Sequence, residues 1–253
     1  MSELLVSDEG PLRRYTLARS HRRNALSYEL CDQLQTAIES AAEDVALLVI
    51  DHEGDTFSSG ADLTEVAPSL ITDDSGPAES RTLQAIWGLF AAIEGVAKPV
   101  VAVVNGRCMA GGLELALSCD LIAATNVARF LDGHLAGGLL PGGGAAIRLP
   151  ERVGLARSFR LLVEGIEIDA ATALAWGLAD DVFADRLELE AWLKRLGERL
   201  AGSPPGLASA IKRQLSAARH PRDGRRFQME LAELETYAKN NRQELRSRLR
   251  RYT

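Results

Sequence analysis

The sequence contains few cysteines and few aromatic residues, and its charged residues show no basic excess. Its three cysteines, Cys31, Cys108 and Cys119, include no pair at the spacing of a zinc or redox motif. An odd number of cysteines without that spacing excludes a disulfide framework and a cysteine-based metal site. We therefore expect reduced, buried thiols, a cytoplasmic protein and no bound metal.

The net charge and the hydrophobic runs exclude two further classes of protein. The net charge is −6, so no overall positive field recruits nucleic acid. Apolar runs are broken by Lys98, Pro99 or Glu114 well before the roughly 20 residues that a membrane span needs. Residues 1–8 lack the basic and then apolar pattern of a signal peptide. The 46% hydrophobic and 25% charged content is that of an ordinary soluble globular protein. We therefore expect neither nucleic acid nor a membrane as a partner.

The expected elements are strands alternating with helices, followed by helices alone. Apolar, β-branched or alternating runs predict strands at residues 12–17, 46–50, 100–104, 120–124 and 128–131. Helical spacing predicts helices from Ser27 to about Asp44 and at residues 82–94, 145–149, 155–164, 170–176, 187–201, 207–218 and 223–253. Residues 64–80 are acidic and aperiodic, which fits either a lid or pocket wall, or a solvated loop. This order predicts an α/β core over residues 1–195 and a helical region over residues 196–253.

Residues 99–120 carry the first sign of chemistry. A buried strand, Val100–Val104, is broken at Asn105 and is followed by Ala110-Gly111-Gly112 and an apolar helix that contains Glu114. Glycines at a helix start leave backbone amides open to a developing oxyanion, and a first-turn carboxylate can point to the same place. The same pattern also fits a turn in which glycine allows tight packing and glutamate complements the helix dipole.

Several motifs together resemble the signature of the enoyl-CoA hydratase/isomerase (crotonase) superfamily. Residues 57–63, Phe-Ser-Ser-Gly-Ala-Asp-Leu, are followed at the family's spacing by Asn-Gly at 105–106, Ala-Gly-Gly-Leu-Glu at 110–114 and Ser-Cys-Asp at 118–120. Residues 19–26, 141–144 and 171–178 match three flanking stretches of the same family. The resemblance covers roughly residues 10 to 185, and the order and spacing make the joint signal specific although each piece alone is weak.

The resemblance implies a spiral of ββα units with a C-terminal helical region that assembles homotrimers or dimers of trimers. It implies an acyl-CoA substrate, with coenzyme A as part of that substrate and no separate cofactor. The backbone amides of Ala61 and Gly111 would hold the thioester carbonyl oxygen, because fixed N–H donors stabilise the charge of an enolate. Arg22 and Arg23 would bind the CoA phosphates or adenosine, although a solvated pair also fits. The other positions matched to substrate binding are Ala25, Ser59, Gly60, Asp62, Leu63, Gly112 and Pro141.

The acid/base residues depart from the family's pattern at one position. Hydratases of the family use two glutamates around one water; Glu114 occupies the first position, and the second falls on His134. With an ordinary pKa near 6.5, His134 could act as a base or could be a structural histidine. Asp132 is expected to face the other way on a strand. The family's usual C-terminal ending is not recognisable, which leaves the tail's contacts with the substrate open.

Three hypotheses about function follow. The first is a hydratase-like lyase in which Glu114 is the principal acid/base group and His134 assists. The second is another reaction through the same oxyanion hole: isomerisation, hydrolysis or decarboxylation of an acyl-CoA, which the altered second position favours. The third is a non-catalytic acyl-CoA binder, against which the retained Glu114 argues. The missing GxGxxG spacing argues against a dinucleotide-dependent oxidoreductase.

Overall fold

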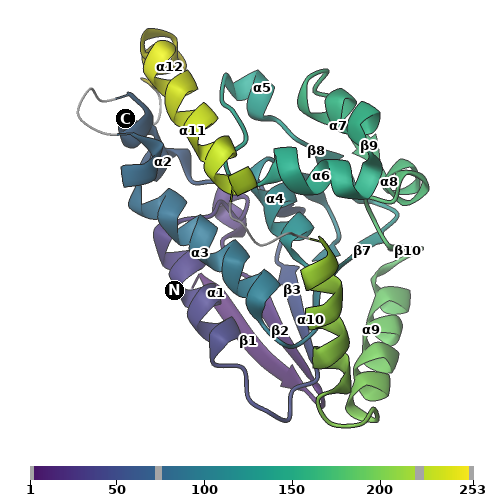
Figure 1. Cartoon of the computed structure of the whole chain (residues 1–253). Coiled ribbons are helices and arrows are strands. Elements are labelled where there is room, and N and C mark those ends of the chain that lie inside the picture. Colours follow the sequence, from purple (N-terminus) through teal and green to yellow (C-terminus); the bar gives the residue numbers. More distant parts are fainter. Residues whose placement is uncertain (1–2, 72–75, 220–224, 251–253) are drawn as a thin grey trace.

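The computed structural model describes residues 3–71, 76–219 and 225–250 (Figure 1). Within these ranges the strands form two sheets. The larger sheet has the order β1 (Leu4–Glu9), β2 (Leu12–Leu17), β3 (Leu47–His52), β5 (Val100–Val104), β7 (Leu121–Thr125) and β10 (Asp181–Phe183). The smaller sheet has the order β4 (Thr56–Ser58), β6 (Arg107–Met109), β8 (Arg129–Leu131) and β9 (Ile168–Asp169).

The strand pairing shows a repeated ββα unit. From β2 to β10 the neighbours in the larger sheet are parallel, while β1 pairs antiparallel with β2. In the smaller sheet β4, β6 and β8 are parallel, and β9 closes it antiparallel. Each of β3, β5 and β7 is followed directly by a short strand of the smaller sheet and then by helix. The chain thus winds as the expected α/β spiral, with both sheets growing in the same order.

Helices cover the sheets and complete the C-terminal region. The first group is α1 (Tyr28–Glu39), α2 (Leu63–Ile71), α3 (Arg81–Gly95), α4 (Gly111–Ser118), α5 (His134–Gly137) and α6 (Ala145–Val153). The second group is α7 (Leu155–Leu162), α8 (Ala170–Trp176), α9 (Arg186–Ala201), α10 (Leu207–Arg219), α11 (Arg225–Asn240) and α12 (Arg242–Leu249). A 3₁₀ turn, η1 (Ser20–Arg22), precedes α1, and a second, η2 (Pro77–Glu79), lies between α2 and α3. No helix of the described ranges is both long and apolar enough to cross a membrane.

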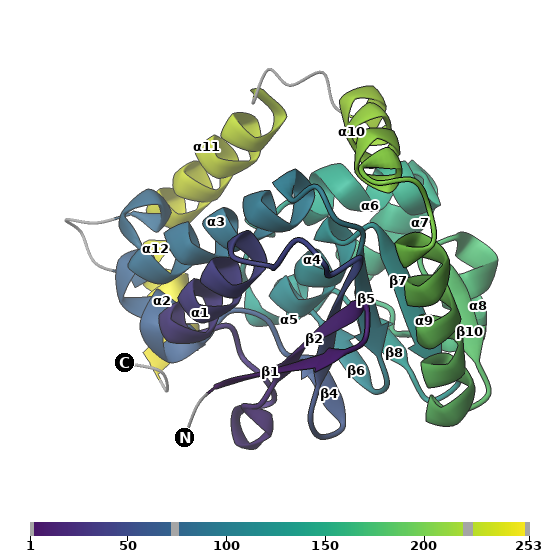
Figure 2. The same cartoon turned by 90° about the horizontal axis from the view of Figure 1, so that it is seen from below.

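The alternation of side chains along the central strands builds two hydrophobic layers. Leu48 and Ile50 of β3 point into the main core, which also contains the apolar faces of α1, α3 and α4. Leu47 and Val49 point the other way and pack with Leu189 and Leu193 of α9. Because both faces of the sheet are covered, β3 and β5 are buried throughout, as their apolar sequences indicate (Figure 2).

The expectation of an aperiodic segment at residues 64–80 is wrong for most of its length. Residues 63–71 form α2 and residues 77–79 form η2, while residues 72–75 lie outside the described ranges. The Asp62 carboxylate accepts hydrogen bonds from the amide and the hydroxyl of Thr64, which fixes the first turn of α2. On α2, Val66 and Leu70 are buried against the C-terminal helices α11 and α12, which lie beside α2 in Figure 1.

Candidate active site

Two turns meet where strands of the smaller sheet end. One follows β4 and contains Gly60 and Ala61; the other follows β6 and contains Ala110 and Gly111. A Cβ placed on Gly111 would lie 3.1 Å from the Ala61 nitrogen, and one placed on Gly60 would lie 2.8 Å from the Gly111 nitrogen. The two backbones can approach this closely only because neither glycine carries a side chain. The turns singled out in the sequence are therefore in contact.

The amides of Ala61 and Gly111 remain open in this contact. Within the described part of the chain, neither amide donates a hydrogen bond to a protein acceptor. Gly111 is the first residue of α4, where an amide has no partner in its own helix. The neighbouring backbone is tied down: Leu26 donates to the Gly60 carbonyl at 2.8 Å, and Asp62 donates to the Leu26 carbonyl at 2.9 Å. Two adjacent backbone donors are thus held in a rigid frame.

Ala110 has a backbone conformation that alanine rarely adopts. Its φ is 47° and its ψ is −122°, immediately before the Gly111 amide. Such conformations cost on the order of 1–3 kcal/mol and persist where the surroundings enforce them. Here the Ala110 amide donates to the carbonyl of Leu131 at 3.1 Å, and its carbonyl accepts from the Glu114 amide. The strained residue sets the plane of the peptide that carries the Gly111 N–H.

Glu114 lies one turn into α4 with its side chain buried, 3% exposed. Its Oε1 accepts hydrogen bonds from the amides of Gly143 at 2.9 Å and Ala145 at 3.0 Å, at the start of α6. Burial raises the pKa of Glu114, while the charge of His134 and the two amides oppose the rise without cancelling it. This carboxyl therefore holds its proton more tightly than an exposed glutamate, which suits an acid/base group.

His134 and Asp132 form a pair beside Glu114, contrary to the expectation that Asp132 faces away. Asp132 Oδ1 lies 2.8 Å from His134 Nδ1, and Oδ2 accepts from the His134 amide at 3.0 Å. The expectation assumed strand alternation, but β8 ends at Leu131 and Gly133 adopts a left-handed conformation with φ 74°, which turns the chain. Both residues lie close enough to Glu114 for their charges to affect its pKa.

Several positions matched to substrate binding lie around the turn that follows β4 and contains Gly60 and Ala61. Ser59 donates to the Arg23 carbonyl, which places the segment around Arg22, Arg23 and Ala25 alongside the turn. Arg22 and Arg23 are exposed, while Ala25 is buried. The carboxylate of Asp62 is committed to Arg19 and Thr64, so within the described structure its contribution is to hold the turn.

The remaining matched positions lie in the turn after β4 and at the start of α2, in α4, and in the segment before α6. Ser59, Leu63 and Pro141 are partly buried, and Gly60 and Gly112 are buried. A Cβ on Gly112 would overlap the Ser58 carbonyl, so this glycine permits the packing of α4 against β4. Pro141 leads into Gly142–Gly144, the turn in which the Gly143 amide donates to Glu114.

Sequence reasoning missed the side chains that contact the segment between His134 and Gly143. Trp87 of α3 donates to the Gly142 carbonyl at 2.7 Å, and Tyr237 of α11 donates to the Gly138 carbonyl at 2.8 Å. Arg248 of α12 packs against Gly138, so the C-terminal helices contact the segment that follows His134. In the sequence Trp87 is one of the apolar residues whose helical spacing predicts the helix at residues 82–94, and a hydrogen bond of its indole to a distant carbonyl leaves no sequence signal.

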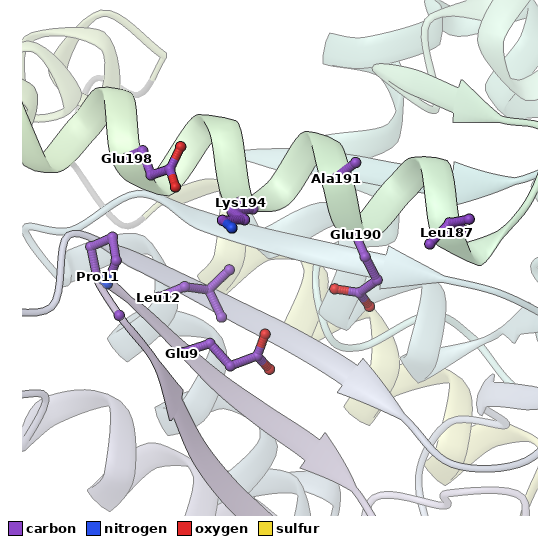
Figure 3. Close-up of a pocket in the computed structure, with 9 residues that line it drawn as sticks. Glu9, Pro11, Leu12, Leu187, Glu190, Ala191, Lys194 and Glu198 are labelled. Carbon is purple, nitrogen blue, oxygen red and sulfur yellow. The ribbon is translucent and has the colours of Figure 1, made fainter.

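A surface pocket lies elsewhere on the molecule. A cavity of about 500 Å³ between α9 and the β1–β2 turn is lined by Glu9, Leu12, Glu190, Lys194 and Glu198, among others (Figure 3). It opens on the α9 side of the larger sheet, whereas α4 packs on the opposite side, so it is separate from Glu114.

The state of the cysteines and the grouping of His, Cys, Asp and Glu side chains decide whether the described residues can hold a disulfide bond or a metal ion. All three cysteines are free and buried, as expected for reduced thiols. The described residues contain no cluster of three or more His, Cys, Asp or Glu side chains that could hold a metal ion.

Comparisons with known proteins identify the family and the fold. The sequence profile described as enoyl-CoA hydratase/isomerase matches residues 10–252. The 2,3-dehydroadipyl-CoA hydratase of Escherichia coli (strain K12) is 35% identical over 217 residues, which cover 85% of this chain and 82% of that protein. The fatty acid oxidation complex subunit alpha of Shewanella frigidimarina is 33% identical over 76% of this chain, which spans 27% of that protein.

Solved structures show the same fold. The crystal structure of enoyl-CoA hydratase from Bacillus halodurans matches with a TM-score of 0.87 at 22% identity, covering 98% of this chain and 99% of that one. One from Mycobacterium avium subsp. paratuberculosis K-10 matches with a TM-score of 0.80 at 28% identity, covering 94% of each chain. The architecture is therefore the crotonase spiral with its C-terminal helices. The chain belongs to the enoyl-CoA hydratase/isomerase family.

Proposed function

We propose that the protein is a lyase that adds water reversibly across the α,β double bond of an enoyl-CoA thioester. The observation that carries the proposal is the contact between two turns with open backbone amides, those of Ala61 and Gly111, together with the buried carboxyl of Glu114 on the helix that Gly111 begins. Two N–H donors on one oxygen favour the enolate over the neutral thioester, and an adjacent acid/base group can then move a proton at carbon.

The thioester carbonyl oxygen accepts hydrogen bonds from both amides, which polarise the conjugated double bond. Water attacks the β-carbon as one acid/base group takes its proton, and negative charge moves to the thioester oxygen. The other group then delivers a proton to the α-carbon. Glu114 is one of these groups and His134 is the other, in the position where hydratases of the family have a second glutamate.

The acyl group is proposed to be an enoyl chain, and a panel of enoyl-CoA thioesters measures the chain length that the protein prefers. The name of the Escherichia coli relative contains a dehydroadipyl group, so a substrate panel should include a chain that ends in a carboxylate. But-2-enoyl-CoA, a medium-chain enoyl-CoA and 2,3-dehydroadipyl-CoA form a suitable set. Arg22 and Arg23, exposed beside the first turn, are proposed to bind the phosphates of CoA.

The test is loss of enoyl-thioester absorbance with wild type, Glu114→Gln and a matched control. Glu164→Gln serves as the control, because Glu164 is exposed in an ion pair with Arg160 on the surface. We expect wild type and the control to hydrate a member of the panel and Glu114→Gln to lose about 10²- to 10⁴-fold in kcat. Full hydration by Glu114→Gln would contradict the role of this carboxyl.

The same panel separates the alternative functions. Release of free CoA would indicate thioester hydrolysis, and a shifted double bond without water addition would indicate isomerisation. Decarboxylation through the same oxyanion hole needs a carboxylate on the α-carbon, so malonyl-CoA is added to the panel, and release of carbon dioxide from it would indicate decarboxylation. Tight binding without turnover would indicate an acyl-CoA binder. Any of these results without hydration would replace the proposed reaction.

A homotrimer, or a dimer of trimers, is the assembly that we propose for this chain. Its support, beyond the family resemblance, is a set of exposed apolar side chains at helical spacing: Leu207, Ile211 and Leu215 on α10, and Leu155 and Phe159 on α7. Sedimentation equilibrium measures the mass directly, and a monomer at micromolar concentration would contradict the assignment.

A further inference from the structure

Asp132 is almost completely buried, although Leu131 before it and Gly133 after it are only partly buried. It is 1% exposed, and both of its carboxylate oxygens contact His134, two residues later in the chain. Oδ1 lies 2.8 Å from the His134 ring nitrogen Nδ1, and Oδ2 accepts from the His134 backbone amide at 3.0 Å. The aspartate therefore holds both the backbone and the ring of His134.

The backbone next to the two open amides holds the segment that contains Asp132 and His134. Leu131, the last residue of β8, accepts a hydrogen bond from the Ala110 amide, and Ala110 precedes the Gly111 amide. The turn at Gly133 then starts α5 with His134 as its first residue. Asp132 thus connects the strand that supports the proposed oxyanion hole to the residue in the second acid/base position.

The contact with Asp132 determines which ring nitrogen carries the proton. A carboxylate only accepts hydrogen bonds, so the nitrogen that faces Oδ1 must be the donor. In the neutral ring Nδ1 then bears hydrogen, and the lone pair that can accept a proton is on Nε2. This tautomer is assigned from the hydrogen-bond network.

We propose that Asp132 is a positioning residue that holds His134 in the Nδ1–H tautomer, so that Nε2 is the base for the attacking water. This inference rests on the proposed hydration reaction. The water O–H bond breaks and its proton goes to Nε2, while the water oxygen bonds to the β-carbon and the π electrons move to the thioester oxygen. Glu114 gives its proton to the α-carbon. After product release, Nε2 loses its proton to solvent and Glu114 regains one.

Asp132→Asn tests the inference because asparagine cannot make both contacts in the same way. If its oxygen accepts from the His134 amide, its NH₂ group faces Nδ1 and forces the proton onto Nε2. The opposite orientation sets an NH₂ donor against the backbone amide donor. We expect kcat to fall about 10²- to 10⁴-fold with KM nearly unchanged, because the base loses its lone pair while the binding groups remain.

A coupled pair and a matched control separate positioning from folding. His134→Ala should lower kcat as far as Asp132→Asn, and the double variant should be no worse than either, because both changes remove the same base. Asp180→Asn is the control: Asp180 also accepts from a backbone amide, that of Ile122, and binds a cation, Arg152. It should keep wild-type kcat. Additive losses in the double variant would overturn the proposal.

Nitrogen-15 NMR of the histidine rings reads the tautomer without an activity assay. At a pH at which the ring is neutral, wild type should show His134 protonated on Nδ1, and Asp132→Asn should show it protonated on Nε2. The His134 signals are those missing from His134→Gln. A wild-type ring protonated on Nε2, or the same tautomer in both proteins, would overturn the proposal. If Asp132→Asn does not fold, Asp132→Ser replaces it, since its hydroxyl can still accept from the His134 amide.

Failure of the proposed function gives a different result from failure of this inference. If wild type hydrates no enoyl-CoA, the reaction is wrong, but the ring spectra still decide whether Asp132 sets the tautomer of His134. If wild type hydrates and Asp132→Asn keeps full kcat, the reaction stands and the role of Asp132 is wrong.

Discussion

Gly60→Ala should damage both stability and activity, since Gly60 lies where the two turns touch. Its φ is +96°, and an added Cβ would lie 2.8 Å from the Gly111 nitrogen and 3.0 Å from the Ala110 Cβ. A non-glycine residue in such a conformation costs about 1–3 kcal/mol. Forcing a methyl group into a packed contact costs about 1–3 kcal/mol more. We expect the free energy of unfolding to fall by about 2–6 kcal/mol in total.

Gly165→Ala provides the matched control. Gly165 also has a positive φ, +67°, but a Cβ there would meet no atom within 4 Å. Its cost is therefore the backbone conformation alone, about 1–2 kcal/mol. Urea unfolding followed by tryptophan fluorescence compares the two variants, and the difference between them measures the contact between the turns.

Activity gives the second reading of the same variant. Because the added methyl group pushes the Ala61 and Gly111 amides apart, one donor to the thioester oxygen is weakened or lost. Loss of one such donor typically costs about 10²- to 10³-fold in kcat. Gly165→Ala should keep wild-type kcat. If Gly60→Ala keeps full kcat and is no less stable than Gly165→Ala, the contact between the turns is not what supports catalysis.

Three further variants test the burial and support of charged and polar groups. Burial raises the pKa of Glu114, so ionising it costs folding free energy as pH rises above about 4.3, its unfolded value. Glu114→Gln should therefore gain stability relative to wild type as pH rises through and above that value in urea unfolding; equal pH profiles would contradict this. Burial alone would raise the pKa of Asp51, but hydrogen bonds and charges from Arg186, the His52 amide and Arg14 lower it. The contribution of the Asp51 carboxylate to stability should be present above about pH 4 and be lost below it. Asp51→Asn should lower the free energy of unfolding by about 3–5 kcal/mol at pH 7. In thermal unfolding, the melting temperature of Asp51→Asn should fall less steeply than that of wild type as the pH drops below about 4. Tyr237→Phe removes the hydrogen bond to Gly138 and should cost about 1 kcal/mol and lower kcat; an unchanged kcat would show that α11 does not support the segment after His134.

The sequence predicts the buried elements well, because burial leaves a clear pattern. The strand at residues 100–104 and the helix at residues 170–176 have the expected bounds, since one is a continuous apolar run rich in valine and the other ends at a glycine. The strand β1 was not predicted, because one of its six residues is buried and no alternation is visible. α2 was missed since its apolar face is short and is interrupted by Pro68.

The candidate site was predicted in its parts and less well in its connections. The motifs bring together the turns at Gly60 and Gly111, and the register places His134 near Glu114. The hydrogen bonds from Gly143 and Ala145 to Glu114 depend on how α6 approaches α4, which spacing along the chain does not specify. The orientation of Asp132 depends on one positive φ, at Gly133, that a strand pattern cannot reveal.

Isotope-edited infrared spectroscopy of a bound enoyl-CoA measures how strongly the two amides polarise the thioester carbonyl that they are proposed to hold. With ¹³C in the thioester carbonyl and Glu114→Gln used to prevent turnover, the C=O stretch should move to a lower frequency than in water. Gly60→Ala, combined with Glu114→Gln, should move the C=O stretch most of the way back to its frequency in water. A carbonyl frequency equal to that in water, with the ligand fully bound, would contradict the central claim that Ala61 and Gly111 polarise the thioester.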